Sequence, residues 1–191
     1  MDPNEGLTWE NLQEHLLRKL QMPQNATFLH GRDPEELASE QTAQILRGFV
    51  GFPQSRTLTG PVTLLRGTDT TPRVLQGARN PFGGWWFPEE TLLKLFARFE
   101  RIRMPEQLQK TAVQGHLRAG LAVSLDWNEL EELWCLQLEA GEQLTGLLGR
   151  TSEQWIDSRV HSLGRLLGGE EQYFFPIIPP LAVKPYPYRL A

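Results

Sequence analysis

Arg66 is the residue of this 191-residue chain whose type and position most directly suggest ligand chemistry. It closes a short apolar run, Val62 to Leu65, and Gly67 follows it. A guanidinium can bind phosphate oxygens in a two-pronged fork, and a glycine lets a ligand approach the backbone closely. The pattern therefore indicates an anion-binding strand end. The alternative interpretation is an ordinary surface arginine at the end of a strand.

An aromatic segment follows a glycine pair, because Gly83 and Gly84 precede Trp85, Trp86 and Phe87. Flat aromatic side chains can stack on a planar ring such as nicotinamide or adenine. Aromatic clusters also fill protein cores, and we expect at least one of the two tryptophans to be buried.

A polar segment near the end of the chain, Glu170-Glu171-Gln172, follows two glycines and precedes the apolar run Tyr173 to Phe175. Polar side chains just before a buried strand can point into a cleft. The alternative is a β-turn followed by an edge strand with a solvated acidic pair.

The order of these three segments resembles the ADP-ribosyltransferase-like superfamily over roughly residues 62–175. In that family a first-strand Arg anchors NAD, and a late acidic pair steers the ribosyl transition state. The resemblance implies that Arg66 and Gly67 hold the NAD phosphates. It also implies that Trp85 and Trp86 lie beside the nicotinamide pocket.

The same resemblance places Glu170 and Gln172 at the family's catalytic pair, with Gln172 where a catalytic Glu normally stands. This late segment is similar to that of the tuberculosis necrotizing toxin type of NAD glycohydrolase, in which a Gln serves and water accepts the ADP-ribose. Alternatively, Glu171 supplies the charge after a one-residue register slip, although a slip also turns the side chain to the other face.

The implied function is an NAD-consuming enzyme, either an NAD glycohydrolase or a mono-ADP-ribosyltransferase, with NAD as its substrate. A bacterial toxin or effector domain is the setting that fits this activity, with a protein acceptor or a cognate protein as a further partner. Two alternatives remain open at this point. One is a catalytically inactive ligand-binding or protein-interaction module with the same fold, and the other is a structural protein that docks through its proline-rich tail.

Hydrophobic periodicity and turn signals predict a single α+β domain over residues 1–191. We expect a helical region at 1–60, a strand-rich core at 61–176 with a mixed, mostly antiparallel split sheet, and a proline-rich tail at 177–191 that forms an extended surface strap. The resemblance makes the sheet one of ADP-ribosyltransferase type. The expected helices are 7–20, one from Pro34 and one from Glu89. The expected strands are 62–65, 121–125, 133–138, 144–148 and 172–175. Residues 70–84 are expected to form a long loop.

Composition and charge exclude several classes of ligand, partner and location. One cysteine and four scattered histidines give no metal-ligand spacing, so we expect no metal site. The net charge of -4 and the dispersed cations make nucleic acid an unlikely partner. No apolar run is long enough for a membrane helix, and no secretory signal is readable. We therefore expect a cytoplasmic protein, although an effector that leaves the cell by a specialised route would look the same.

Overall fold

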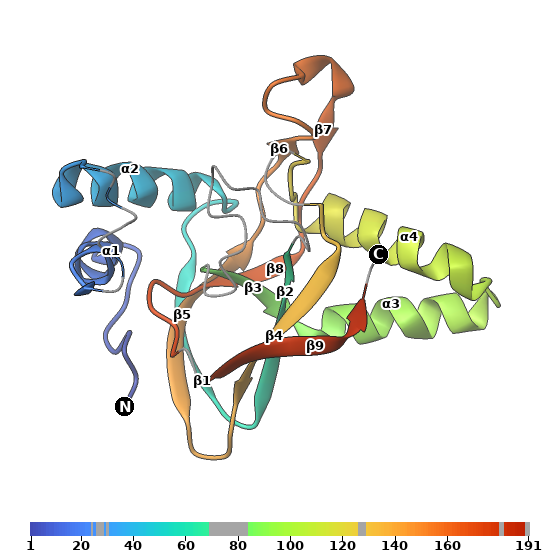
Figure 1. Ribbon diagram of the computed structural model, residues 1–191, viewed down its shortest axis with the longest axis horizontal. Coiled ribbons are helices and arrows are strands. Elements are labelled where there is room, and N and C mark those ends of the chain that lie inside the picture. Colours follow the sequence, from blue (N-terminus) through green and yellow to red (C-terminus); the bar gives the residue numbers. More distant parts are fainter. Residues whose placement is uncertain are drawn as a thin grey trace.

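The computed structural model describes residues 1–23, 25, 29, 31–68, 84–125, 129–179 and 182–189. Figure 1 shows helices on two sides of a strongly twisted sheet and a small hairpin that projects away from it. The α+β class and the mostly antiparallel sheet are confirmed. The helices are α1 (Leu12–Leu20), α2 (Pro34–Arg47), α3 (Glu89–Arg101) and α4 (Glu106–Gly120), with a short 3-10 turn, η2 (His161–Leu163).

The main sheet has seven strands in the order β1-β5-β8-β3-β2-β4-β9, and each neighbouring pair is antiparallel. Two further strands form the projecting hairpin. The strands are β1 (Gln54–Thr59), β2 (Val62–Thr68), β3 (Trp85–Pro88), β4 (Glu132–Leu138), β5 (Gln143–Arg150), β6 (Gln154–Trp155), β7 (Arg165–Leu166), β8 (Glu171–Phe174) and β9 (Val183–Arg189).

Strand β3 joins two halves of this sheet and changes partner halfway along its length. Trp85 and Trp86 pair with β8, whereas Phe87 and Pro88 pair with β2. By contrast, β2 and β4 pair over seven residues. The connection between the halves is therefore narrow, and the ladder between β2 and β3 ends at Leu65, just before Arg66.

Each helix pair packs against its own half of the sheet (Figure 1). Helices α1 and α2 enclose a cluster with Phe49, Leu147 and Phe174. Helices α3 and α4 cover a cluster that contains Leu65 and Phe87. A third cluster, which includes Trp86 and Phe175, lies around β4 and β5. Burial of these apolar stripes fixes both helix pairs relative to the strands.

The helix start at Pro34 is confirmed and has the expected cause. The Asp33 carboxylate accepts hydrogen bonds from the Glu35 and Glu36 amides at 2.7 and 3.1 Å, and Pro34 occupies the first helical turn. The first helix begins later than predicted, at Leu12 instead of Leu7.

Several sequence predictions are wrong, and the structure gives the reasons. Residues 121–125 form a turn after α4, a helix that the sequence patterns missed. Strand β1 lies inside the region expected to be helical, and the unexpected helix α4 lies inside the region expected to be strand-rich. The helix predicted from Glu89 is confirmed as α3. The tail is an edge strand, β9, that pairs with β4 instead of a strap. Most of the expected loop, residues 70–83, lies outside the described residues. None of the described helices has the length and apolar character needed to cross a bilayer.

Candidate functional site

A pocket of about 700 Å³, here called the central pocket, opens where the two halves of the sheet separate. Strands β2, β3 and β8 line it together with α1, α2 and the turn that follows α4. Four of the seven residues singled out from the sequence line this pocket: Arg66, Gly67, Trp85 and Gln172. These residues are separated by up to about a hundred positions in the chain, and the sheet order brings them together.

The other three candidates lie elsewhere. Trp86 is fully buried in the cluster around β4 and β5, so it is a core residue and not a neighbour of the pocket. Glu170 and Glu171 line a separate, smaller pocket of about 190 Å³ that also contains His116 and Lys94. Successive side chains on a strand point to opposite faces, which explains why Trp85 lines the pocket whereas Trp86 lies in the core.

The guanidinium of Arg66 is buried at the pocket wall with an unsatisfied donor. Its Nη1 atom is buried and has no hydrogen-bond partner in the described part of the chain. Burial lowers the pKa of Arg66 to about 10, so the group is still charged at neutral pH. Because buried polar groups are almost always paired, an orphaned guanidinium nitrogen requires an explanation.

A second cation, Lys19 at the end of α1, lies near Arg66. Burial, and then the positive charge of Arg66, lower the pKa of Lys19 to about 8. Arg47 of α2 also lines the pocket, and no Asp or Glu does so among the described residues. The electrostatic character of the described lining is therefore positive.

Trp85 is held in place by packing on three sides. Its ring lies 4.9 Å from Phe49 and 5.3 Å from Phe174, the latter in an edge-on arrangement. A Cβ atom at Gly48 would come within 2.8 Å of the indole, so this glycine gives the ring its room. The indole is partly exposed and lines the pocket as a fixed aromatic surface.

Gln172 is buried, with 6% of its surface exposed, and it lines the central pocket. It pairs with Gly149 of β5, and Phe174, two residues further along β8, lines the same pocket. Glu171 pairs with Arg150 and is exposed. The observed register thus directs Gln172 into the pocket, and the alternative in which a slipped Glu171 takes its place is not adopted.

Gly67 lines the pocket and also makes room for a neighbouring side chain. A Cβ atom there would lie 2.2 Å from Leu130 Cδ2, so the glycine makes room for a pocket-lining leucine. Leu130 has a φ of 56°, a left-handed conformation that bulky side chains rarely adopt. The close packing of Leu130 on Gly67 forms part of the pocket wall.

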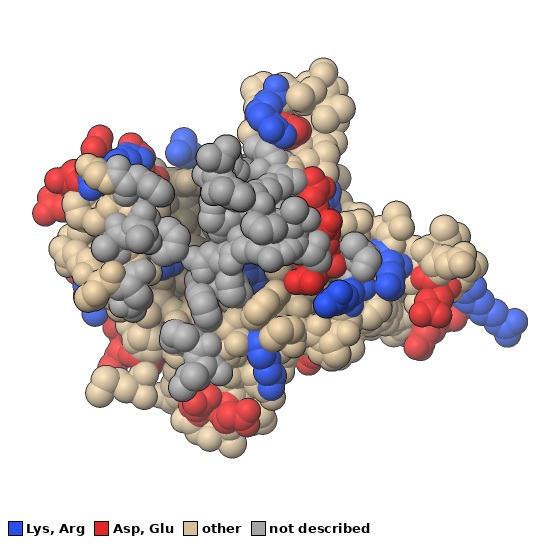
Figure 2. Space-filling view, in the orientation of Figure 1, with Lys and Arg blue, Asp and Glu red and all other residues tan. Residues whose placement is uncertain are grey.

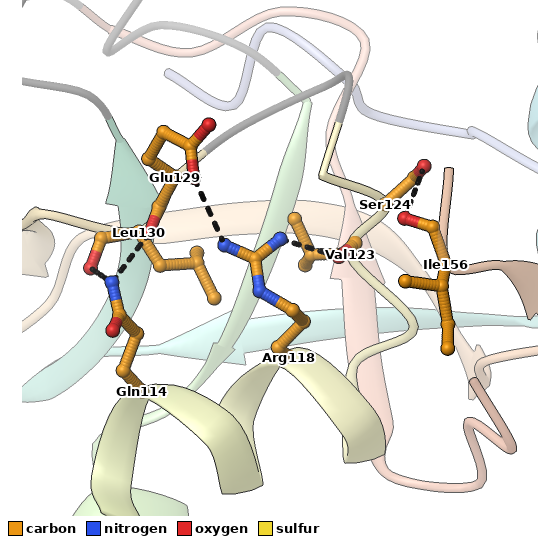
Figure 3. A network of polar contacts seen from close by, with 7 residues as sticks. All are labelled: Gln114, Arg118, Val123, Ser124, Glu129, Leu130 and Ile156. Atoms are coloured by element: carbon orange, nitrogen blue, oxygen red, sulfur yellow. Dashed lines mark hydrogen bonds and ion pairs between the residues drawn. The ribbon is translucent and has the colours of Figure 1, made fainter. Parts of the chain in front are cut away.

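A polar network from α4 holds that wall (Figure 3). Gln114 donates to the Glu129 carbonyl at 2.6 Å, and Arg118 donates to the Val123 carbonyl at 2.9 Å. Arg118 also lies 3.9 Å from the Glu129 carboxylate. The network ties the turn after α4 and the segment just before β4 to one helix face, and both segments line the pocket through Val123 and Leu130.

The wall beside α2 is fixed in the same way. Thr151 Oγ1 donates to the Gly120 carbonyl at 2.8 Å, and Ser152 Oγ donates to the Arg47 carbonyl at 2.6 Å. Gln154 in turn donates to Ser152 Oγ at 3.1 Å. Sequence patterns predicted none of these supporting contacts.

Metal ligation finds no support in the described ranges, where no group of three His, Cys, Asp or Glu side chains is placed to hold an ion. Cys135 is buried, and burial raises the pKa of its thiol. On the face shown in Figure 2, the coloured Lys, Arg, Asp and Glu side chains lie in small separate groups, without a continuous basic stripe.

Comparison with known proteins leaves the family open. The chain matches no protein-family model and no curated protein. Among solved structures it is similar, with a TM-score of 0.43 and 12% sequence identity, to a chain described as Rhs1-CT in complex with cognate immunity protein RhsI1. That similarity covers 74% of this chain and 82% of the other.

Proposed function

We propose that the central pocket binds NAD and that the protein cleaves the bond between nicotinamide and ribose, as an NAD glycohydrolase or a mono-ADP-ribosyltransferase. One observation carries the proposal: Arg66, Trp85 and Gln172, from three adjacent strands, line one pocket. Its volume lies in the usual range for small-molecule sites.

The chemistry of the lining suits the parts of this substrate. Arg66 offers a buried, unpaired donor and a positive charge to the phosphates. Trp85 offers a fixed aromatic surface for a planar ring. The buried Gln172 amide can donate to or accept from a ribose hydroxyl.

We assign the sheet to the ADP-ribosyltransferase type as part of the same proposal. The supporting observation is that the strands carrying Arg66, Trp85 and Gln172 are neighbours, in the order β8-β3-β2, and that the sheet divides at the middle one. This is the arrangement that a shared NAD site between an arginine strand and a late polar strand requires.

The proposed reaction breaks one bond and forms one. The electron pair of the bond between the ribose carbon and the pyridinium nitrogen leaves with nicotinamide, which departs neutral. The cationic ribosyl group then takes water, releasing a proton, or takes a nucleophile of a protein acceptor. Gln172 orients the ribose through hydrogen bonds, and its carbonyl dipole replaces the full charge that a carboxylate would bring.

A second candidate function is a ligand-binding module with the same fold and no catalysis. The observation that favours it is the absence of a carboxylate from the described lining of the pocket, since Glu170 and Glu171 lie at a different one. Such a module binds NAD without releasing nicotinamide.

The deciding experiment measures nicotinamide release from NAD by the purified protein. We expect turnover by the wild type, its loss in Arg66→Met, and at least a tenfold decrease in Gln172→Ala. Gln172→Glu should be faster than the wild type, because a carboxylate stabilises the ribosyl cation better than an amide. Arg56→Met, which changes an exposed arginine of β1, is the control. NAD binding without any turnover, in the wild type and in Gln172→Glu, would favour the binding module, and a lack of binding would exclude both.

A further inference from the structure

Two cations on different elements line the central pocket, and no Asp or Glu among the described residues lines it with them. Arg66 comes from β2 and Lys19 from the last turn of α1. Neither side chain makes an ion pair with the described residues, and Arg66 Nη1 lacks any hydrogen-bond partner there. Like charges brought together in a desolvated site repel each other, so the ligand-free protein holds an unfavourable arrangement.

The position of Lys19 is fixed by packing. Leu16 and Leu20, on either side of it along α1, are buried against α2 and Phe174. The carbonyl of Lys19 accepts a hydrogen bond from Asn25 Nδ2 at 2.7 Å, which secures the end of the helix. The backbone of Lys19 is therefore held beside the pocket that this residue lines.

We infer that Lys19 and Arg66 together form a two-cation site for the diphosphate group of a nucleotide ligand. A planar guanidinium binds two phosphate oxygens at once, and an ammonium adds a compact point charge. Two positive charges match the two negative charges of a diphosphate bridge better than a single carboxylate does. The aromatic surface of Trp85 in the same pocket fits the ring of such a nucleotide.

This inference rests on the proposed function for the identity of the complete ligand, but the anion site can be tested separately. ADP is the probe, and adenosine, which has the same ring and sugar without phosphate, is the comparison. Titration calorimetry should detect ADP binding by the wild type. Lys19→Met should weaken ADP binding at least tenfold, Lys19→Arg should retain most of it, and Arg66→Met should abolish it.

Lys94→Met is the matched control, because Lys94 is an exposed lysine of α3 outside the central pocket. It should bind ADP as the wild type does. Adenosine binding, where measurable, should be the same in all variants. Thermal melts of every variant establish that a loss of binding is not a loss of folding.

A second measurement separates an anion contact from a merely structural lysine. At pH 8.5, above the lowered pKa of Lys19, the ammonium is partly deprotonated, and an anion should restore its proton. The other charged groups of the described lining are Arg47 and Arg66, and Arg66 stays protonated at this pH. ADP binding to the wild type should therefore take up protons, visible as a dependence of the measured heat on the buffer. Lys19→Met and Lys19→Arg should show no such uptake.

The inference is overturned if folded Lys19→Met binds ADP like the wild type, if proton uptake is the same in both, or if the wild type does not bind ADP at millimolar concentration. Parallel measurement of nicotinamide release keeps the two ideas distinct. Lys19-dependent ADP binding without nicotinamide release supports the diphosphate site and contradicts the enzymatic proposal. Equal nicotinamide release by Lys19→Met and wild type supports the enzyme and contradicts this site.

Discussion

Replacing Arg66 by Met should stabilise the ligand-free protein. The substitution keeps an unbranched, apolar side chain and removes a buried positive charge with an unpaired donor. Burial lowers the pKa of Arg66 to about 10, and a shift of this size corresponds to about 3 kcal/mol of penalty at neutral pH. Allowing for the contacts that the guanidinium itself makes, we expect a net stabilisation of about 2 kcal/mol.

Thermal and urea unfolding of the ligand-free protein measure this effect. For a domain of this size, a gain of about 2 kcal/mol raises Tm by about 4–8 °C. Arg56→Met is the control, since Arg56 is exposed on edge strand β1. Its unfolding free energy should change by less than about 0.5 kcal/mol, the usual range for surface substitutions.

The two outcomes for Arg66 have different meanings. Higher stability together with lost ligand binding shows that the arginine is kept at a cost to folding and serves a ligand. A fall in Tm of Arg66→Met, with Arg56→Met unchanged, would refute the reasoning, because it would mean that the guanidinium stabilises the fold.

Four further predictions concern the central pocket and the edge strand β9. Because the pKa of Lys19 is lowered in the folded state, the unfolded chain binds more protons than the folded chain above about pH 8. The free energy of unfolding of the ligand-free wild type should therefore rise by about 2 kcal/mol between pH 7.5 and 10. Urea unfolding of Lys19→Met should show no such rise. Gly67→Ala should cost about 1–3 kcal/mol in urea unfolding because its Cβ meets Leu130, and it should cost much less in a Leu130→Ala background. Tyr186→Phe should lower the free energy of unfolding by about 1 kcal/mol, because it removes the 2.8 Å hydrogen bond to Glu89. Deletion of residues 183–191 should prevent cooperative unfolding, because it removes strand β9 from its pairing with β4. A truncated protein as stable as the wild type would contradict this and mean that β9 does not stabilise the fold.

Local sequence signals were sufficient for the elements that carry their own start and stop. Asp33 and Pro34 predicted the start of α2, and the apolar runs predicted β2, β4, β5 and β8 to within a few residues of their observed bounds. The prolines of the tail suggested a strap, yet Pro185 pairs opposite Trp134 at the edge of the sheet. An edge strand tolerates proline because the outward side of its backbone needs no partner.

The failures came from segments whose structure depends on distant contacts. Leu121 to Leu125 has the composition of a strand, but Ala122 adopts a φ of 50° and Leu121 ends α4. The contact of Arg118 with the Val123 carbonyl favours the turn. Such a contact has no signature in a local window, so tertiary packing overrode the β-propensity of the run.

The residues of the candidate site also differ in whether a local sequence signal predicts them. Arg66, Trp85 and Gln172 were found because each stands at a visible transition between polar and apolar residues in a strand. The alternation of side chains on a strand could have shown that Trp86 does not share a face with Trp85. Lys19 has no comparable signal, because it lies beside the apolar stripe of α1 like many solvent-facing lysines.

The narrow joint at β3 links the fold to the proposed chemistry. Arg66 pairs with Trp134 of β4 on one side, but it lies beyond the end of the ladder between β2 and β3, where the pocket opens. A cation at such an opening is desolvated by the apolar walls and attracts an anion more strongly than a surface cation in water would. The same arrangement then makes the burial of Arg66 unfavourable in the free protein and the binding of an anion favourable in the proposed complex. A chain without a ligand would gain stability by losing either Arg66 or Lys19, whereas the proposed anion in the pocket would offset the cost of keeping both.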